Sequence, residues 1–521
     1  MQKSLILILL LFFCMLGYAQ EGNVGGLVGG VPPRGLSLWP LLDTVGHAPL
    51  MVQLGYEHRF SPRTVGEYHR NDPSIPYYYQ PSQGRHITGA YLDASGVLRR
   101  SNWAMHGKAG YSRSIHRGVF GSLGAMPQLF YPYTVSVGES RREVREVYSL
   151  AGDAIFQHGA LAFGAGGSYS GGTHYSQIDP RVRSRVGDLG MHLAVSVERW
   201  ILMATVQGDF RYTLDALSVR TLGEDRKDIY YYLLGAGLYD HNLSIPQSSF
   251  SMQSSRYEGG VTAQLQIRTR GVHTLWGALS ASGTQNDNGT LPVVASTRGR
   301  CAMLGVGSEY VWGAFTLRGW GSYRHCRRLG YELLYDTVTV HYAPNIVEMR
   351  EYARTPAWQG AAQQILCGFR LSNQRPWGTL SLYAEGYGAK HSSSAAFPSY
   401  GGSTSQKGLR CRMGIDIPVA LWVVRLAMRY QQRWGYLHHA FLPENGGATV
   451  QEERMLIGYG AQSYHALGGD VEVERCLYRQ YRIGLKATML LVSYPGIDAK
   501  GRWLSIALWY ALGGCSTKIL L

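Results

Sequence analysis

Basic side chains recur at alternate positions in the C-terminal third of the chain. Arg410 and Arg412 share one face of a segment in which polar and apolar residues alternate, and Arg425 and Arg429 share one face of the next. Guanidinium groups suit carboxylate, phosphate and sulfate, which they bind through paired hydrogen bonds. The spacing therefore predicts a surface that binds or selects anions. We call it the basic track, and its members are Arg370, Arg410, Arg412, Arg425, Arg429, Arg482 and Lys486.

The same arginines have a second interpretation, in which they pair with acidic residues and stabilise the protein. Glu385, Asp416, Glu472 and Glu474 alternate in the same way in neighbouring segments. The formal net charge of +15 also suits an anion-lined pore or a surface that faces anionic lipopolysaccharide. Nucleic-acid binding is not expected, because the N-terminus predicts export. The interpretations of the track remain open at this point.

The chain has no pattern typical of an enzyme or a metal site. A G-x-S-x-G elbow and an H-E-x-x-H helix are both absent. Asn286-Asp287-Asn288-Gly289 resembles the start of a calcium loop but lacks the later acidic ligand, so we interpret it as a turn. We expect no catalytic activity, no metal and no cofactor.

The N-terminus has the features of an export signal. Met1-Gln2-Lys3 carries positive charge, Leu5–Leu16 is an apolar run, and Gly17 and Ala19 are small residues before the predicted cleavage site. We therefore predict a signal peptide over residues 1–19 and an N-terminal periplasmic segment over 20–49. A barrel over 50–513 and a C-terminal tail over 514–521 complete the predicted organisation.

Long β-strands are the elements that must position the basic track. In Trp200–Thr213 one face is apolar, with Leu202 and Val206, and the other becomes polar, with Gln207 and Asp209. A charge on the lipid side near the bilayer midplane costs roughly 2–4 kcal/mol, so the arginines must face a wet lumen. The segments are also longer than the about 5–6 residues of an average soluble strand. Both observations favour a barrel that crosses a membrane.

Short and long connections alternate along the chain, as in outer-membrane barrels. The short joints lie near residues 99–102, 157–159, 198–199, 268–271, 313–314, 372–377, 418–421 and 475–479. Longer irregular stretches are predicted at residues 60–85, 116–142, 176–185, 213–254, 284–298, 327–360, 390–407, 435–462 and 495–501. The predicted fold is all-β: a single transmembrane antiparallel β-barrel of about 18 strands, with short periplasmic turns and long extracellular loops.

One predicted hairpin fixes a register. A two-residue turn at Gly313-Ala314, with glycine first, suits a type II′ hairpin. Glu309 then faces Arg318, which is a favourable cross-strand pair of opposite charge. Further from the turn, Cys301 faces Cys326 at a Cα separation of about 4.5–5.5 Å, within the range of a disulfide. We predict a lumen ion pair between Glu309 and Arg318 and, in an oxidising compartment, a disulfide between Cys301 and Cys326.

In these features the chain resembles the large, porin-like outer-membrane β-barrels of Bacteroides-type bacteria, many of which have no assigned function. The resemblance covers the mature chain and rests on the signal ending Tyr18-Ala19-Gln20, the Gly- and Tyr-rich alternating strands and the asymmetric connections. It implies a location in the outer membrane, contact with membrane lipid and lipopolysaccharide, and insertion by the barrel assembly machinery. It identifies no functional residue.

The leading functional hypothesis is a channel for polar or anionic solutes, because barrels of about 16–18 strands leave an aqueous lumen unless they are plugged. The main alternative is a non-transport role as a scaffold, an adhesin or a partner of another outer-membrane protein in an export or uptake complex. A hydrolase with catalytic residues at the rim is a weaker alternative.

Overall fold

The computed structural model describes most of the chain between residues 50 and 512. The described residues are 50–60, 84–100, 102–130, 133–176, 181–220, 230–234, 239–243, 249–287, 295–339, 347–395, 400–441, 461–478, 481–494 and 500–512. The predicted signal peptide, the N-terminal periplasmic segment and the C-terminal tail lie outside these residues.

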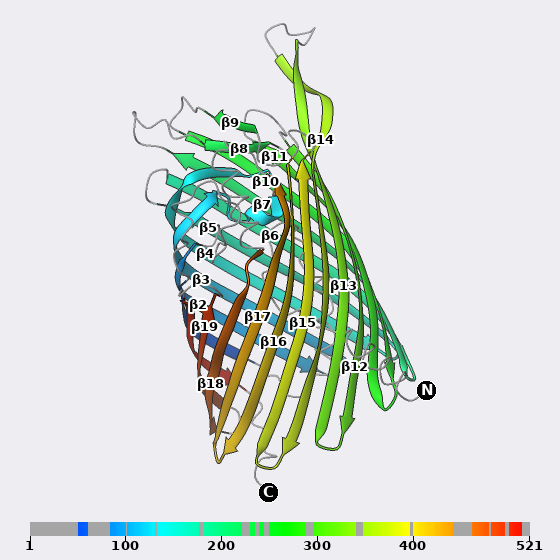
Figure 1. Ribbon diagram of the computed structural model, residues 1–521. Coiled ribbons are helices and arrows are strands. Elements are labelled where there is room, and N and C mark those ends of the chain that lie inside the picture. Colours follow the sequence, from blue (N-terminus) through cyan, green and yellow to red (C-terminus); the bar gives the residue numbers. More distant parts are fainter. Residues whose placement is uncertain are drawn as a thin grey trace.

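The described chain forms a closed antiparallel barrel of 18 strands, which confirms the predicted fold (Figure 1). β1 closes it by pairing with both β2 and β20. The barrel strands are β1 (Leu50–Phe60), β2 (His86–Arg100), β3 (Trp103–Ser122), β4 (Val135–His158), β5 (Leu161–Tyr175), β6 (Arg181–Arg199), β7 (Leu202–Arg220), β10 (Ser249–Arg268), β11 (Gly271–Asp287), β12 (Ala295–Trp312), β13 (Phe315–Thr339), β14 (Val347–Arg375), β15 (Gly378–Ala395), β16 (Tyr400–Val419), β17 (Trp422–Phe441), β18 (Tyr464–Tyr478), β19 (Tyr481–Ser493) and β20 (Lys500–Leu512).

The two ends of the barrel differ. At one end, which we call the turn end, consecutive strands are two residues apart at every joint that the sequence predicted to be short. Gly313 has a φ of +58° there, whereas Ala314 is not among the residues with positive φ, as a type II′ turn requires. β1 begins and β20 ends toward the same end, because Leu50 pairs with Leu512. We call the opposite end, with the longer connections, the loop end.

Several strands continue further toward the loop end than predicted. Residues 327–360, expected to be irregular, belong largely to β13 and β14, whose ends project beyond the rim (Figure 1). β15, β16 and β17 likewise extend into the stretches predicted to be loops. A polar strand can keep its ladder of hydrogen bonds in water, so strand formation need not stop where the apolar residues stop.

Short elements also occupy two of the loop-end connections. A hairpin of β8 (Tyr230–Leu234) and β9 (Tyr239–Leu243) lies between β7 and β10, and β8 pairs with the start of β4. The helix α3 (Pro127–Phe130) lies between β3 and β4. Within the described residues, no helix combines the length and the hydropathy needed to cross a membrane.

The two faces of the strands have opposite character. On β6, Met191 and Leu193 are 53% and 69% exposed, whereas Asp188 and Ser196, on the other face, are each only 4% exposed. The segment between β3 and β4 contacts the polar face of β7, β11 and β13. Because β4 and β13 lie far apart in the strand order, that segment reaches β13 through the interior. The polar face is therefore the lumen, and the apolar face is the outer surface.

Candidate functional site

The structure places the basic track on the lumen face of β14, β16, β17 and β19, toward the turn end. Arg410 contacts Glu385 at 3.2 Å and lies over the ring of Tyr387. Arg429 contacts Asp470 at 2.5 Å, and Arg412 contacts the same carboxylate at 3.4 Å. These arginines therefore share carboxylate partners instead of presenting bare charge to the lumen.

Arg425 is the most heavily paired member of the track. Its guanidinium lies 2.5 Å from Glu474, 2.9 Å from Glu472 and 3.9 Å from Asp416. Glu474 also accepts a hydrogen bond from Arg482 at 3.1 Å. The four acids that the sequence offered as internal partners all contact the track, and Asp470, which the sequence analysis did not name, is a fifth.

Two members of the track differ from the rest. Arg370, on β14, is exposed, and Lys486, on β19, is half-buried. Neither residue forms an ion pair with another described residue. Lys486 lies opposite Glu472 in the strand register, but Glu472 contacts Arg425. Arg370 lies opposite Arg318 on one side and Tyr383 on the other. The unneutralised charge of the track is therefore concentrated at these two positions.

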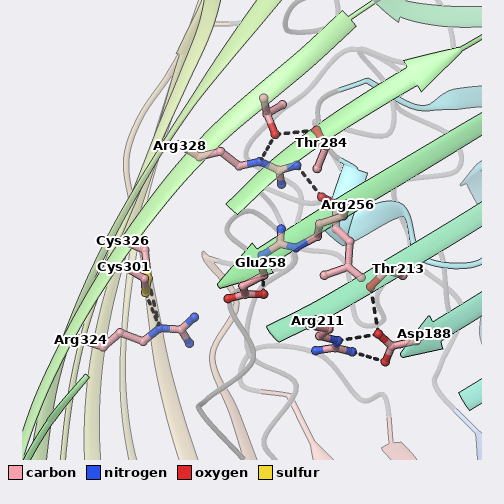
Figure 2. Close-up of polar contacts among 12 residues, drawn as sticks. Asp188, Arg211, Thr213, Arg256, Glu258, Thr284, Cys301, Arg324, Cys326 and Arg328 are labelled. Carbon is pink, nitrogen blue, oxygen red and sulfur yellow. Dashed lines mark hydrogen bonds and ion pairs between the residues drawn. A yellow bond between two sulfur atoms is a disulfide. The ribbon is translucent and has the colours of Figure 1, made fainter. Parts of the chain in front are cut away.

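The hairpin of β12 and β13 has the predicted register. Glu309 lies opposite Arg318, and Arg318 Nε donates to Glu309 Oε2 at 2.6 Å. Cys301 lies opposite Cys326, with Cα atoms 4.1 Å apart, and the two residues form a disulfide on the lumen face. Arg324 Nε donates to both sulfur atoms, at 3.3 and 3.2 Å (Figure 2).

A feature that the sequence did not predict is a segment that folds into the lumen. It lies between β3 and β4 and includes α3, and we call its described residues, 123–130 and 133–134, the inward segment. Three of its apolar side chains are buried, with Leu123, Phe130 and Tyr133 each at most 2% exposed. Asp215 on β7 accepts hydrogen bonds from the backbone N–H groups of Ala125 at 2.8 Å and Met126 at 3.3 Å. The inward segment is thus attached to a strand remote from its own.

Two further strands hold the inward segment from the other side. Asn286 on β11 donates from Nδ2 to the carbonyl of Tyr133 at 2.9 Å. Arg328 on β13 donates from Nη2 to the carbonyl of Leu129, at the end of α3. Together with Asp215 on β7, these contacts attach the segment to three strands other than its own. The segment therefore narrows the lumen at the loop end.

Arg328 belongs to a group of lumen arginines that we call the loop-end cluster: Arg256, Arg324 and Arg328 (Figure 2). Arg328 is 2% exposed, and its Nε donates to Thr297 Oγ1 at 2.9 Å. Its Nη1 is buried without a hydrogen-bond partner, and no carboxylate among the described residues pairs with it. Arg256 is 4% exposed and pairs with Glu258 at 3.0 Å.

The opposite lumen wall carries a group of histidine and aspartate residues. Asp153 on β4 lies 3.3 Å from His106 Nδ1 and 3.2 Å from His192 Nε2. Gly166 lies between Asp153 and His192, and a Cβ at Gly166 would be 2.3 Å from the Asp153 carboxylate, so a larger residue there would displace these side chains. Within the described part of the chain, no three His, Cys, Asp or Glu residues are arranged to hold a metal ion.

Sequence reasoning missed the inward segment and its anchors for a physical reason. Asp215 contacts backbone 90 residues away, and Arg328 contacts backbone 199 residues away. Neither residue interrupts the alternation of its strand, so each looks like any other polar lumen position. The aromatic residues Phe130 and Tyr133 were the available signal. Large apolar side chains in a connection favour a segment that packs against the rest of the protein.

A closed barrel with an apolar outer surface, a charged lumen and an inward-folded segment has the architecture of a transmembrane β-barrel. The chain belongs to the DUF6850 family, a family of unknown function, whose model matches residues 76–339 and so slightly more than half of the chain. A search of curated proteins finds no match.

Solved structures with a similar arrangement include outer-membrane transporters and receptors. The transporter YddB from Escherichia coli is 8% identical, with a TM-score of 0.38, over 88% of this chain and 80% of that chain. A mutant of the ferric enterobactin receptor PfeA from Pseudomonas aeruginosa is 7% identical, with a TM-score of 0.40, over 89% and 80%. The RagAB peptide transporter is 7% identical, with a TM-score of 0.38, over 89% and 87%.

Proposed function

We propose that this protein is an outer-membrane channel for polar solutes, with a preference for anions, whose mouth is narrowed by the inward segment. The observation that carries the proposal is the position of that segment: a short helix and its flanking residues are fixed across the lumen by Asp215, Asn286 and Arg328. A barrel of about 18 strands encloses an aqueous lumen, and a fixed inward segment sets its narrowest cross-section.

In this proposal the turn end faces the periplasm and the loop end faces the exterior, as in bacterial outer-membrane barrels of the Bacteroides type. A solute entering from outside meets the loop-end cluster first and the basic track second. Arg256 and Arg328 lie beside the inward segment, and Arg370 and Lys486 supply unneutralised charge further down. Positive groups on one wall of a low-dielectric passage raise the local concentration of anions.

The pairing of the track limits how strong this preference is. Arg410, Arg412, Arg425 and Arg429 each contact a carboxylate, so their field is largely cancelled at short range. We therefore expect a modest anion preference, in contrast to that of a pore lined by bare arginines.

The experiment is conductance of the refolded full-length chain in planar bilayers, under a salt gradient. We expect single-channel steps and a reversal potential displaced toward anions. A folded barrel that conducts no ions would contradict the proposal. In that case the scaffold or adhesin role, or partnership with another outer-membrane protein, would be favoured, and a stable companion should then co-purify from the native membrane.

The proposal includes no catalytic function. The weaker rim-hydrolase alternative requires a serine or metal-bound water beside an activated histidine at one rim. Of the described serine–histidine contacts, that of His438 with Ser405 lies near the loop end, at 2.8 Å, and the contacts described for His438 include no carboxylate. Hydrolysis of ester or amide substrates by the folded chain, abolished by replacing Ser405 with Ala, would revive that alternative.

A further inference from the structure

The outer surface carries arginines that face one another across neighbouring strands. Arg117 on β3 lies opposite Arg142 on β4, Arg181 on β6 lies opposite Arg220 on β7, and Arg300 on β12 lies opposite Arg327 on β13. All of these side chains are exposed. We call this set the outer arginine belt, and its members are Arg117, Arg142, Arg181, Arg220, Arg300 and Arg327.

The members of the belt point away from the lumen. Arg181 shares its face of β6 with the exposed Met191 and Leu193, and Arg300 shares its face of β12 with the exposed Leu304. Arg328, the lumen residue that holds the inward segment, is the neighbour of Arg327 in the sequence and so lies on the opposite face of β13. The belt is therefore on the surface that would contact the membrane.

The height of the belt on the barrel is informative. Each member lies more than about 11 residues along its strand from the turn end, which is the length that a tilted strand needs to cross the hydrocarbon. Nearer the turn end, on β3, β4, β7 and the neighbouring β10, are pairs of outward tyrosines. The Tyr111 and Tyr148 rings are 4.9 Å apart on β3 and β4, and the Tyr212 and Tyr257 rings are 4.8 Å apart on β7 and β10. Tyrosine is enriched at the level of lipid headgroups.

Like charges directly opposite on adjacent strands repel each other. No carboxylate contact is described for any member of the belt, whereas the nearby outward Arg113 pairs with Glu146 at 3.2 Å. A repulsive arrangement that recurs on three separate strand pairs near the loop end, without a described carboxylate beside it, would be relieved by a negative charge from outside the chain. A phosphate group has the oxygen atoms to accept hydrogen bonds from two guanidinium groups at once.

We propose that the outer arginine belt binds the phosphate groups of anionic lipid headgroups, of the lipopolysaccharide type, in the leaflet at the loop end. Each Arg–Arg pair is one binding position, and the tyrosines beneath it contact the boundary between headgroup and acyl chain. This proposal does not rest on conduction through the lumen, because the belt and the lumen residues lie on opposite faces of the strands.

The test uses the full-length chain, refolded in mixed micelles of phosphatidylcholine and lipid A, the phosphorylated lipid moiety of lipopolysaccharide. After detergent exchange, the lipid A that remains with the protein is quantified by phosphate analysis. We expect the native chain to retain lipid A, and a variant with all six belt arginines replaced by Gln to retain at least about tenfold less. A variant with the six replaced by Lys should retain an intermediate amount, because it keeps the charge but loses the planar fork.

Matched controls establish whether the belt arginines bind the lipid phosphate itself. Replacing Arg113 and Arg354, two exposed arginines that already have carboxylate partners, with Gln should leave retention unchanged. Folding of each variant is checked by the heat-dependent shift in gel mobility that closed barrels show. Lipid A without its phosphates should not be retained. Equal retention by the native chain and the six-Gln variant, or full competition by millimolar inorganic phosphate, would overturn the proposal, the latter by indicating a small-anion site.

Discussion

The basic track and the loop-end cluster both place arginines on the lumen face of the barrel but use them in different ways. In the track, Arg425 and Arg429 are partly exposed and lie against carboxylates. In the loop-end cluster, Arg328 is buried and its described contacts are a threonine hydroxyl and a backbone carbonyl. The comparison teaches that a lumen arginine can either neutralise acids or fix a chain segment, and that burial and partner type distinguish the two roles.

The largest expected effect comes from removing an anchor of the inward segment. Asp215→Ala would leave the N–H group of Met126 without its described acceptor and the N–H group of Ala125 with the Ser184 hydroxyl alone, and an unsatisfied group costs about 1–3 kcal/mol. We expect the segment to leave the lumen and the single-channel conductance to rise. Asp416→Asn, at a half-exposed lumen position on the track, is the control and should not change the conductance. An unchanged conductance for the folded Asp215 variant would show that the segment is not the constriction.

A smaller effect is expected when the fork of Arg328 is replaced by a point charge. Arg328→Lys keeps the positive charge, but it cannot reach Thr297 and Leu129 together with parallel donors. We expect open-channel current noise to increase while the anion preference stays, and the temperature of barrel unfolding to fall slightly. Arg429→Lys, at a paired track position, is the matched control. If both variants behave alike, the contrast between anchoring and neutralising arginines is wrong.

The third prediction compares a paired and an unpaired member of the track. Arg370→Gln removes a charge that has no carboxylate partner among the described residues, so the reversal potential should move toward cations without loss of stability. Arg429→Gln also removes one charge but leaves Asp470 with a weaker contact to Arg412, so it should lower stability as well. Measuring the reversal potential and the free energy of unfolding of both variants separates the effect of a lumen charge on ion selectivity from its effect on stability. Equal losses of stability in the two variants would contradict the distinction between paired Arg429 and unpaired Arg370.

The smallest effect is expected at the lumen pair near the turn end. Glu309 and Arg318 are 30% and 56% exposed, so their ion pair is screened by water. The double-mutant cycle of Glu309→Gln and Arg318→Gln should give a coupling energy of about 0–1 kcal/mol in denaturant unfolding. A much larger value would mean that this part of the lumen excludes water.

Much of the architecture could be predicted from the sequence because the membrane imposes a strict alternation on each strand. The outward Leu202 and Val206 and the inward Gln207 followed directly from that alternation. Strand ends at the loop end were predicted too short, since polar strands in water carry no apolar signal. For the track, the arginines and several of their acids could be named, but which carboxylate each guanidinium meets depends on strand register. The inward segment depends on contacts between strands far apart in the sequence, which alternation cannot encode.

The disulfide between Cys301 and Cys326 has a consequence for how the barrel is assembled. It joins two positions of one hairpin, separated by 25 residues, that face each other only in the native register. A slip of one residue would turn the charged face of β13 toward lipid. If the bond forms while the chain is still outside the membrane, β12 and β13 are delivered as a covalently aligned unit. Arg324 and Arg328 are then already on the lumen face when the hairpin inserts. β14 pairs with a β13 strand whose register is fixed.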